Sequence, residues 1–161
     1  IASLADIKKV LFLLAERVGV RLRRKNLLGR TVSVYLRFGD RTGWGERHSQ
    51  KEFLSDGEGI FRAAERLLEP LRSFRPVRAL GVTVSDLVER SQLTASIFPE
   101  IRRQEDLAGS IDQLNNRYGE WTIHRAVIHK IRQRIFNLPD GRNKRLYLPQ
   151  ITNINPFTKR V

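Results

Sequence analysis

The stretch Gly29–Asp40, GRTVSVYLRFGD, alternates apolar and polar residues along its length. Successive side chains of a strand point to opposite faces of a sheet, so this pattern predicts a half-buried β-strand. The apolar face holds Val32, Val34, Leu36 and Phe38, and the polar face holds Thr31, Ser33, Tyr35 and Arg37. The apolar face has the composition of a core surface. What the polar face is for is the open question, because the chain around it is strongly basic.

Two amphipathic helices are predicted around this strand. The first begins after Ser3, with Asp6 at capping-box spacing, and its apolar residues recur every three or four positions. The second is predicted within residues 55–74, with Ser55 and Glu58 at the same spacing. Pro70 should kink or end its last turn, because proline cannot continue a helix.

Two further strands are predicted. Residues 46–54, ERHSQKEFL, are polar on both faces and indicate a strand at a sheet edge. Residues 76–88 alternate, which places Leu80, Val82 and Val84 inward and Ala79, Gly81 and Thr83 outward.

The order α-β-β-α-β over residues 1–90 predicts an α+β domain. With one more strand in front it is the split β-α-β arrangement, β-α-β-β-α-β, a four-stranded sheet with both helices on one face. Residues 91–161 are assigned to a linker, a helix and a basic C-terminal tail. That helix covers residues 103–119 and ends at Gly119, and its apolar stripe is Leu107, Ile111, Leu114 and Tyr118. Residues 122–136 fit a helix or a strand.

The composition favours a polyanionic partner. The chain has 30 Lys and Arg against 17 Asp and Glu, a formal net charge of +13, and such an excess is typical of nucleic-acid binding. The absence of cysteine excludes disulfides, thiolate metal sites and cysteine nucleophiles. No apolar run is long enough to span a bilayer and no signal-peptide pattern opens the chain, so we expect no membrane partner and a cytoplasmic location. The missing initiator Met indicates a piece of a longer chain.

The sequence shows no pattern of an active site. Its only histidines are His48, His124 and His129, and the five-residue spacing of the last two does not place them on one helix face. The segment GWG at residues 43–45 lacks the lysine and the helix of a phosphate-binding loop. We therefore expect no zinc site and no cofactor in this chain.

Basic residues flank every predicted strand. They are Arg30, Arg37, Arg41, Arg47, Lys51, Arg75 and Arg78. Such a cluster binds phosphates through counterion release without preference for sequence. The small outward residues of the last strand would also let a phosphate approach main-chain amides.

Several segments together resemble the little-finger domain of Y-family DNA polymerases, in particular bacterial polymerase IV. In order, they are LAERVGVRLRRKNLLGRTVSVYLRF at 14–38, GIFRAAERLL at 59–68, PVRALGVTVSDL at 76–87 and LAGSIDQLNNRYGEWTIHRA at 107–126. Each motif alone is weak, but the ordered set is specific and extends over residues 3 to 126.

The resemblance implies a non-catalytic, DNA-gripping fragment of a DNA-directed DNA polymerase, a nucleotidyltransferase that acts in lesion bypass and DNA repair. In that family the sheet lies in the major groove of the primer–template duplex, and the Mg²⁺-binding carboxylates belong to a separate palm. The residues expected to contact DNA are Arg30, Tyr35, Arg37, Arg41, Arg47, His48, Ser49, Gln50, Lys51, Arg78 and Thr83. The register of the strand within residues 46–54 stays open.

The family's first strand has no counterpart here, because only Ile1 and Ala2 precede the first helix. We expect three native strands, or a vacant position filled by another segment or a neighbouring molecule. The segment RLYLPQITNI, residues 145–154, is one candidate, and a strand-swapped dimer of the fragment is another.

An alternative function is docking on the sliding clamp. Polymerases of this family use a Gln-x-x-Leu-Phe-type peptide, and SQLTASIF at 91–98 offers Gln92, Leu93, Ile97 and Phe98. Gln92 and Phe98 are two residues too far apart, so either the motif is stretched or Thr94 replaces the glutamine. An ordinary linker, with Ile97 and Phe98 packed on the domain, fits as well. A third option, an RNA-binding sheet, is disfavoured because such sheets expose two or three aromatic residues and only Tyr35 qualifies.

Overall fold

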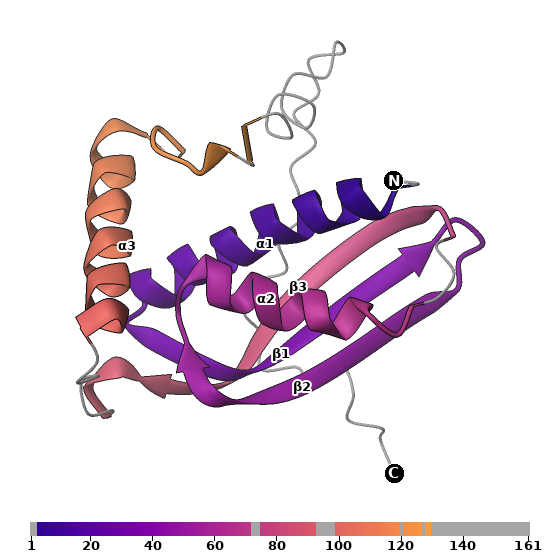
Figure 1. Cartoon of the computed structure of the whole chain (residues 1–161), viewed down its shortest axis with the longest axis horizontal. Coiled ribbons are helices and arrows are strands. Elements are labelled where there is room, and N and C mark those ends of the chain that lie inside the picture. Colours follow the sequence, from indigo (N-terminus) through magenta and orange to yellow (C-terminus); the bar gives the residue numbers. More distant parts are fainter. Residues whose placement is uncertain (1–2, 72–74, 93–98, 120, 127, 130–161) are drawn as a thin grey trace.

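The computed structural model describes residues 3–71, 75–92, 99–119, 121–126 and 128–129 (Figure 1). Its elements are α1 (Leu4–Arg24), β1 (Leu27–Phe38), β2 (Gly43–Leu54), α2 (Gly57–Leu68), β3 (Val77–Glu89), a short 3-10 helix η1 (Arg90–Gln92) and α3 (Pro99–Tyr118). The α+β class and the order of the elements are confirmed. The candidate filler strand, residues 145–154, lies outside the described residues.

The three strands form one antiparallel sheet in the order β2-β1-β3, with β1 in the centre. Both α1 and α2 lie on the same side of this sheet (Figure 1). Helix α1 packs against β3 and β1, while α2 packs against β1 and β2. The opposite side of the sheet carries no helix among the described residues.

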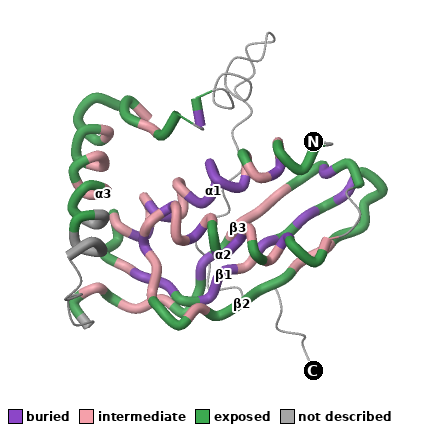
Figure 2. Tube along the Cα trace, in the orientation of Figure 1, coloured by how far each residue is buried: buried purple, intermediate pink, exposed green. Residues whose placement is uncertain are grey.

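The core lies between the helix pair and one face of the sheet. Val32, Val34 and Leu36 of β1 are 0% exposed, and they pack with Ile7 and Ile60 from the two helices. Each fully buried aliphatic side chain contributes roughly 1.5–3 kcal/mol. The inward placement predicted for the apolar residues of GRTVSVYLRFGD is therefore confirmed. In Figure 2 the buried segments of β1 contrast with β2, which is exposed along most of its length.

The helix caps differ from the sequence prediction. Ser3 has the extended backbone of an N-cap, but its side chain makes no capping hydrogen bond. At α2 the N-cap is Asp56 and not Ser55, because the Asp56 carboxylate accepts the Gly59 N–H at 2.6 Å. Ser55 is buried and its hydroxyl accepts from Arg90 at 2.8 Å. Helix α2 ends at Leu68, just before Pro70, as expected.

Helices α1 and α2 cross at two glycines. A Cβ atom added to Gly57 would lie 2.6 Å from the Cα atom of Glu16, and one added to Gly19 would lie 2.8 Å from the Gly57 nitrogen. Only glycine permits this approach. The crossing places Glu16 against the first turn of α2.

Helix α3 lies across the C-terminal end of α1 (Figure 1). Arg23 donates two hydrogen bonds to the Asp112 carboxylate, at 2.6 and 2.9 Å, and Arg24 donates to Asn116 at 2.8 Å. The helix ends at Tyr118, before Gly119 with φ of 110°, as the sequence indicates. No helix within the described ranges is long and apolar enough to cross a membrane.

Candidate nucleic-acid interface

The open face of the sheet, opposite α1 and α2, is defined by the cross-strand register. Directly opposed residues of an antiparallel pair share a face, and every second residue along a strand returns to it. Ser33 lies between Arg47 and Thr83, and Tyr35 lies between Gly45 and Gly81. The full set of opposed positions is Thr31, Ser33, Tyr35, Arg37, Gly43, Gly45, Arg47, Ser49, Ala79, Gly81, Thr83 and Ser85. None of these twelve is acidic.

The register of β2 divides the basic cluster that the sequence could not orient. Arg47 and Ser49 face the open side, opposite Ser33 and Thr31. His48 pairs with Val32 and therefore points to the other side of the sheet, where it is exposed at the edge. Gln50 and Lys51 fall in a register shift between the Thr31–Ser49 and Gly29–Leu54 pairs. A pattern search misses this shift, because β2 has no apolar face to fix its register.

Tyr35 lies at the centre of the open face and its side chain is 48% exposed. A Cβ atom added to Gly43 would lie 3.0 Å from the Tyr35 hydroxyl oxygen, so the phenol ring extends along the glycine of β2. On the β3 side, a Cβ added to Gly81 would meet nothing within 4 Å. The centre of the face is therefore one aromatic ring beside bare main chain, which a large flat ligand can approach closely.

Several cations on the sheet are available to a ligand. The side chains of Arg37, Arg41, Lys51 and Arg78 are exposed, and within the described part of the chain these side chains have no carboxylate, hydrogen-bond or ring partner. By contrast, Lys8 pairs with Glu65 at 2.9 Å and Arg125 pairs with Glu58 at 2.6 Å on the helix side. The sheet and its hairpin end therefore carry positive charge that the protein itself does not neutralise.

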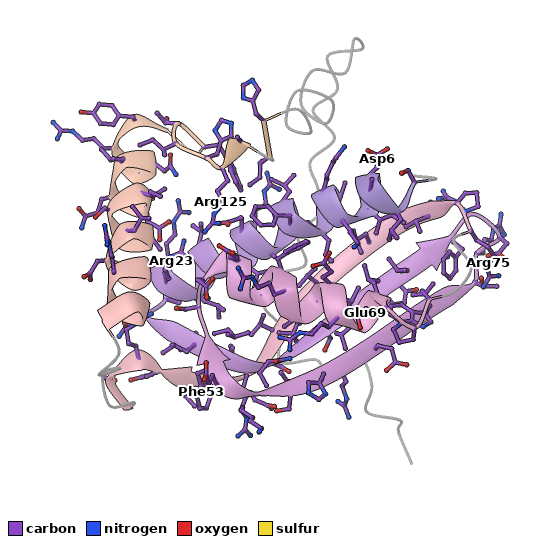
Figure 3. All side chains as sticks on the ribbon, in the orientation of Figure 1. Asp6, Arg23, Phe53, Glu69, Arg75 and Arg125 are labelled. Atoms are coloured by element: carbon purple, nitrogen blue, oxygen red, sulfur yellow. The ribbon has the colours of Figure 1, made fainter. Side chains whose placement is uncertain are left out.

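Two other predicted cations have partners within the protein. Arg75 donates to Asp40 at 2.8 Å and its guanidinium lies 4.5 Å from the centre of the Phe38 ring. The hydroxyl of Thr42, followed by its main-chain N–H, holds the pKa of Asp40 below its ordinary value, and Arg75 adds to this. Arg30 lies 5.6 Å from the centre of the Phe53 ring; Figure 3 labels Arg75 and Phe53 at opposite ends of the sheet.

The far end of the open face is closed by a carboxylate. Thr31 donates its hydroxyl hydrogen to Asp86, a non-glycine residue with φ of 53°. Thr31 is consequently buried and unavailable to a ligand. The usable part of the face therefore runs from Ser33 toward the β1–β2 hairpin.

The two C-terminal histidines meet, which the sequence analysis did not expect. His124 Nε2 lies 3.2 Å from His129 Nδ1 and the two rings stack. Their spacing seemed unfavourable only for a continuous helix, and the chain leaves the helix after Tyr118. No group of three or more His, Cys, Asp or Glu side chains positioned for a metal ion is found among the described residues.

The candidate clamp segment follows β3 directly. Gln92 is the last residue of η1. Leu93, Ile97 and Phe98 lie outside the described residues, so this part of the sequence analysis stays a prediction.

The fold and the open face define a class: an α+β domain with two helices covering one side of an antiparallel sheet and, on the other side, a basic surface with no acidic residue at its opposed positions. The impB/mucB/samB family C-terminal domain model matches residues 1–97. The chain belongs to this family, the C-terminal domain of Y-family DNA polymerases that its motifs resemble.

Curated relatives agree with this assignment. The chain is 37% identical over 123 residues to a DNA polymerase IV of Moorella thermoacetica, a match that covers 76% of this chain and 31% of the relative. It is 31% identical over 124 residues to a DNA polymerase IV of Clostridium acetobutylicum, with the same coverage. It is 32% identical over 125 residues to DNA polymerase IV 2 of Bacillus subtilis, covering 76% of this chain and 30% of that protein. The chain thus spans about a third of the length of these relatives.

Proposed function

We propose that the open sheet face binds duplex DNA through its phosphates. The observation that carries this proposal is the cross-strand register, which collects Arg37 and Arg47 with the hydroxyls of Ser33, Ser49 and Thr83 on a face with no acidic residue at its opposed positions. Guanidinium and hydroxyl groups are the usual donors to phosphate oxygens. The opposite face is occupied by α1 and α2 and is not available for a partner of this size.

The proposed contacts position DNA without reading its sequence. The face offers no Asn or Gln at its opposed positions, and its arginines lie beside glycine and small residues. Phosphate contacts fix orientation and carry no sequence information. The domain would therefore grip a primer–template duplex equally well on any sequence, as a polymerase requires while it moves.

We further propose that this domain serves a translesion polymerase in DNA repair. The relatives that carry the same segment are named DNA polymerase IV. Catalysis and its Mg²⁺ ions would belong to the part of those proteins that this chain does not match. The role of the chain would be to hold the duplex while that part acts.

The test is a paired charge removal. Arg37→Ala, on the open face, with Lys51→Ala, on the edge strand β2, is expected to weaken binding on duplexes of unrelated sequence alike, because both side chains are exposed and neither has a partner within the described part of the chain. If each contacts one phosphate, the slope of log affinity against log salt should fall by about 0.9 per residue. Fluorescence anisotropy at several salt concentrations measures both quantities.

The matched control removes two exposed cations from the helix side, Lys9→Ala with Arg66→Ala. It changes the net charge by the same amount and should leave the salt slope nearly unchanged. If both pairs reduced affinity and slope equally, binding would depend on overall charge and the assignment to the sheet face would fail.

Docking on the sliding clamp through residues 92–98 is kept as the second candidate function. It rests on the sequence alone. Changing Ile97 and Phe98 to Ala should abolish capture by the clamp while leaving duplex affinity intact. Retained capture would remove this candidate.

A further inference from the structure

We call the described part of residues 99–129 the C-terminal extension. It exposes most of the large apolar side chains that reach solvent among the described residues. Six such residues occur among the described residues, and four belong to the extension: Leu107 at 60%, Leu114 at 40%, Tyr118 at 62% and Ile123 at 40% exposed. Contiguous exposed apolar surface on a folded domain marks an interaction site. DNA binding by the open sheet face does not account for it.

Helix α3 is attached to the domain through its polar side. Asp112 and Asn116, one turn apart, bind Arg23 and Arg24 of α1. Leu107, Ile111, Leu114 and Tyr118 follow heptad-like spacing on another side of α3. Helix α3 contacts the domain through its polar side. Its apolar stripe is therefore left without the apolar partner against which such a stripe normally packs.

Leu107 and Ile111 of this stripe line one wall of a groove of about 740 Å³. The other walls are the C-terminal half of α1, the corner between β2 and α2, and the turn after α3. The apolar lining residues are Val20, Phe53, Leu54, Leu107, Ala108, Ile111, Trp121, Ile123 and Ile128. Figure 3 shows Arg23 and Arg125, both lining residues, in the region between α3 and the helix pair.

The lining of this groove has a small excess of positive charge, with six arginines against five carboxylates. Among the lining carboxylates, Glu16 and Glu58 both bind Arg125, and Glu58 also binds Arg62. Asp112 binds Arg23, and Asp56 caps α2. Glu52 is exposed at the rim. Arg21 lines the groove and has no partner among the described residues.

Complementarity of charge selects the kind of occupant. The chain's own residues 130–161 contain eight Lys and Arg and a single Asp, and a second copy would bring a net charge of +13. Both would be repelled by the arginines around the groove. An occupant with carboxylates beside its apolar anchors would be attracted.

We propose that this groove docks an amphipathic, acidic helix of another protein. Its apolar anchors, spaced by three and four residues, would contact Leu107, Ile111 and Trp121, and a flanking carboxylate would pair with Arg21. This is the helix-in-groove mode of recognition. The proposal does not depend on DNA binding, because the groove lies among the helices and the corner of the sheet, away from the open face.

The test selects helical peptides from display libraries by their binding to the whole chain. Two display libraries of 18-residue peptides share an amphipathic apolar pattern, and one carries Glu and the other Lys beside the anchors. We expect enrichment of the Glu library only, with dissociation constants on the order of micromolar, as for small interfaces. Leu107→Asp and Arg21→Glu should each weaken the selected peptide about tenfold or more. The matched controls Leu4→Asp and Arg66→Glu should leave its affinity unchanged.

Exchanging the charges of the peptide and of Arg21 tests the proposed ion pair specifically. The selected peptide with its Glu replaced by Lys should bind Arg21→Glu better than wild type. The proposal is wrong if neither library yields a binder, if Leu107→Asp and Arg21→Glu leave binding intact, or if the Lys library is enriched. It is also wrong if a DNA duplex displaces the peptide and loses affinity in Arg21→Glu, or if wild type sediments as a dimer that Leu107→Asp dissociates.

Discussion

At Gly57 the main chains of α1 and α2 approach within a distance that excludes any side chain. A Cβ there would lie 2.5 Å from the Cδ atom of Glu16. Gly57→Ala is therefore expected to lower the free energy of unfolding by about 1–3 kcal/mol, the usual cost of overpacking. Gly81→Ala is the control, since its Cβ would meet nothing within 4 Å. Urea denaturation measures both; equal stability of the two variants would contradict the crossing geometry.

Glu16 provides a pH-dependent test of the same crossing. Burial raises the pKa of Glu16 above its ordinary value of 4.5, against the opposing effects of Arg125 and Arg23. The unfolded chain therefore loses this proton first, and ionisation of Glu16 lowers stability as the pH rises from about 4.5 through the folded-state pKa.

Glu16→Gln should remove this pH dependence. The stability of wild type relative to Glu16→Gln is expected to fall across that interval and to be constant at lower pH. Chemical denaturation between pH 3.5 and about 8 checks the sign, since linkage relates the slope to the protons bound in each state. If the stability of wild type relative to Glu16→Gln rose with pH, the effect of Arg125 on the pKa of Glu16 would be larger than that of burial.

The sequence predicted which side of the sheet some site residues face and did not predict it for others, for a physical reason. Tyr35, Arg37 and Thr83 were assigned to the outer face correctly, because β1 and β3 each have an apolar face that fixes their orientation. Arg47, Ser49 and His48 had no such reference, and only the pairing of β2 with β1 separates them. The partners of Arg75 come from residues distant in sequence and left no local signal.

At the scale of the elements, the most direct test concerns the attachment of α3 to α1. Arg23 and Asp112 retain only 14% and 13% exposed side-chain surface, and their two hydrogen bonds join α3 to α1. Asp112→Asn should weaken this attachment by about 1.5–3 kcal/mol, the range for hydrogen bonds to charged groups.

Hydrogen exchange of the α3 amides measures that change. Protection should fall by roughly tenfold or more, because about 1.4 kcal/mol corresponds to a factor of ten. Asp106→Asn, on an exposed position of the same helix, is the control and should leave protection unchanged. Identical exchange in both variants would show that the ion pair does not hold α3.

The elements themselves were predictable where one periodicity dominates. Helices α1 and α2 and strands β1 and β3 follow from their apolar repeats, and the break at Pro70 follows from proline chemistry. The caps were not predictable in detail, because Ser55 and Asp56 are both good N-cap residues and only burial of Ser55 decides between them. The placement of α3 depended on Arg23 and Asp112, 89 residues apart, which no local pattern connects.

At the scale of the whole molecule, the two sides of the sheet have separate roles. The helix side contains the core and most of the ion pairs, and the open side carries cations without carboxylates at its opposed positions. The net charge of +13 predicted a polyanion as the partner, but it did not say which surface binds it. The register of the three strands is the reason for proposing the open face as that surface.

The central claim is that duplex DNA lies on the open face, and an NMR titration tests it most directly. A short duplex is added to the labelled chain at moderate salt, and amide shifts are followed for all assigned residues. The account predicts the largest shifts at Ser33, Tyr35, Arg47, Gly81 and Thr83, with little change at the outer surface of α2. Shifts concentrated on α2 and α1, with the open face unchanged, would contradict it.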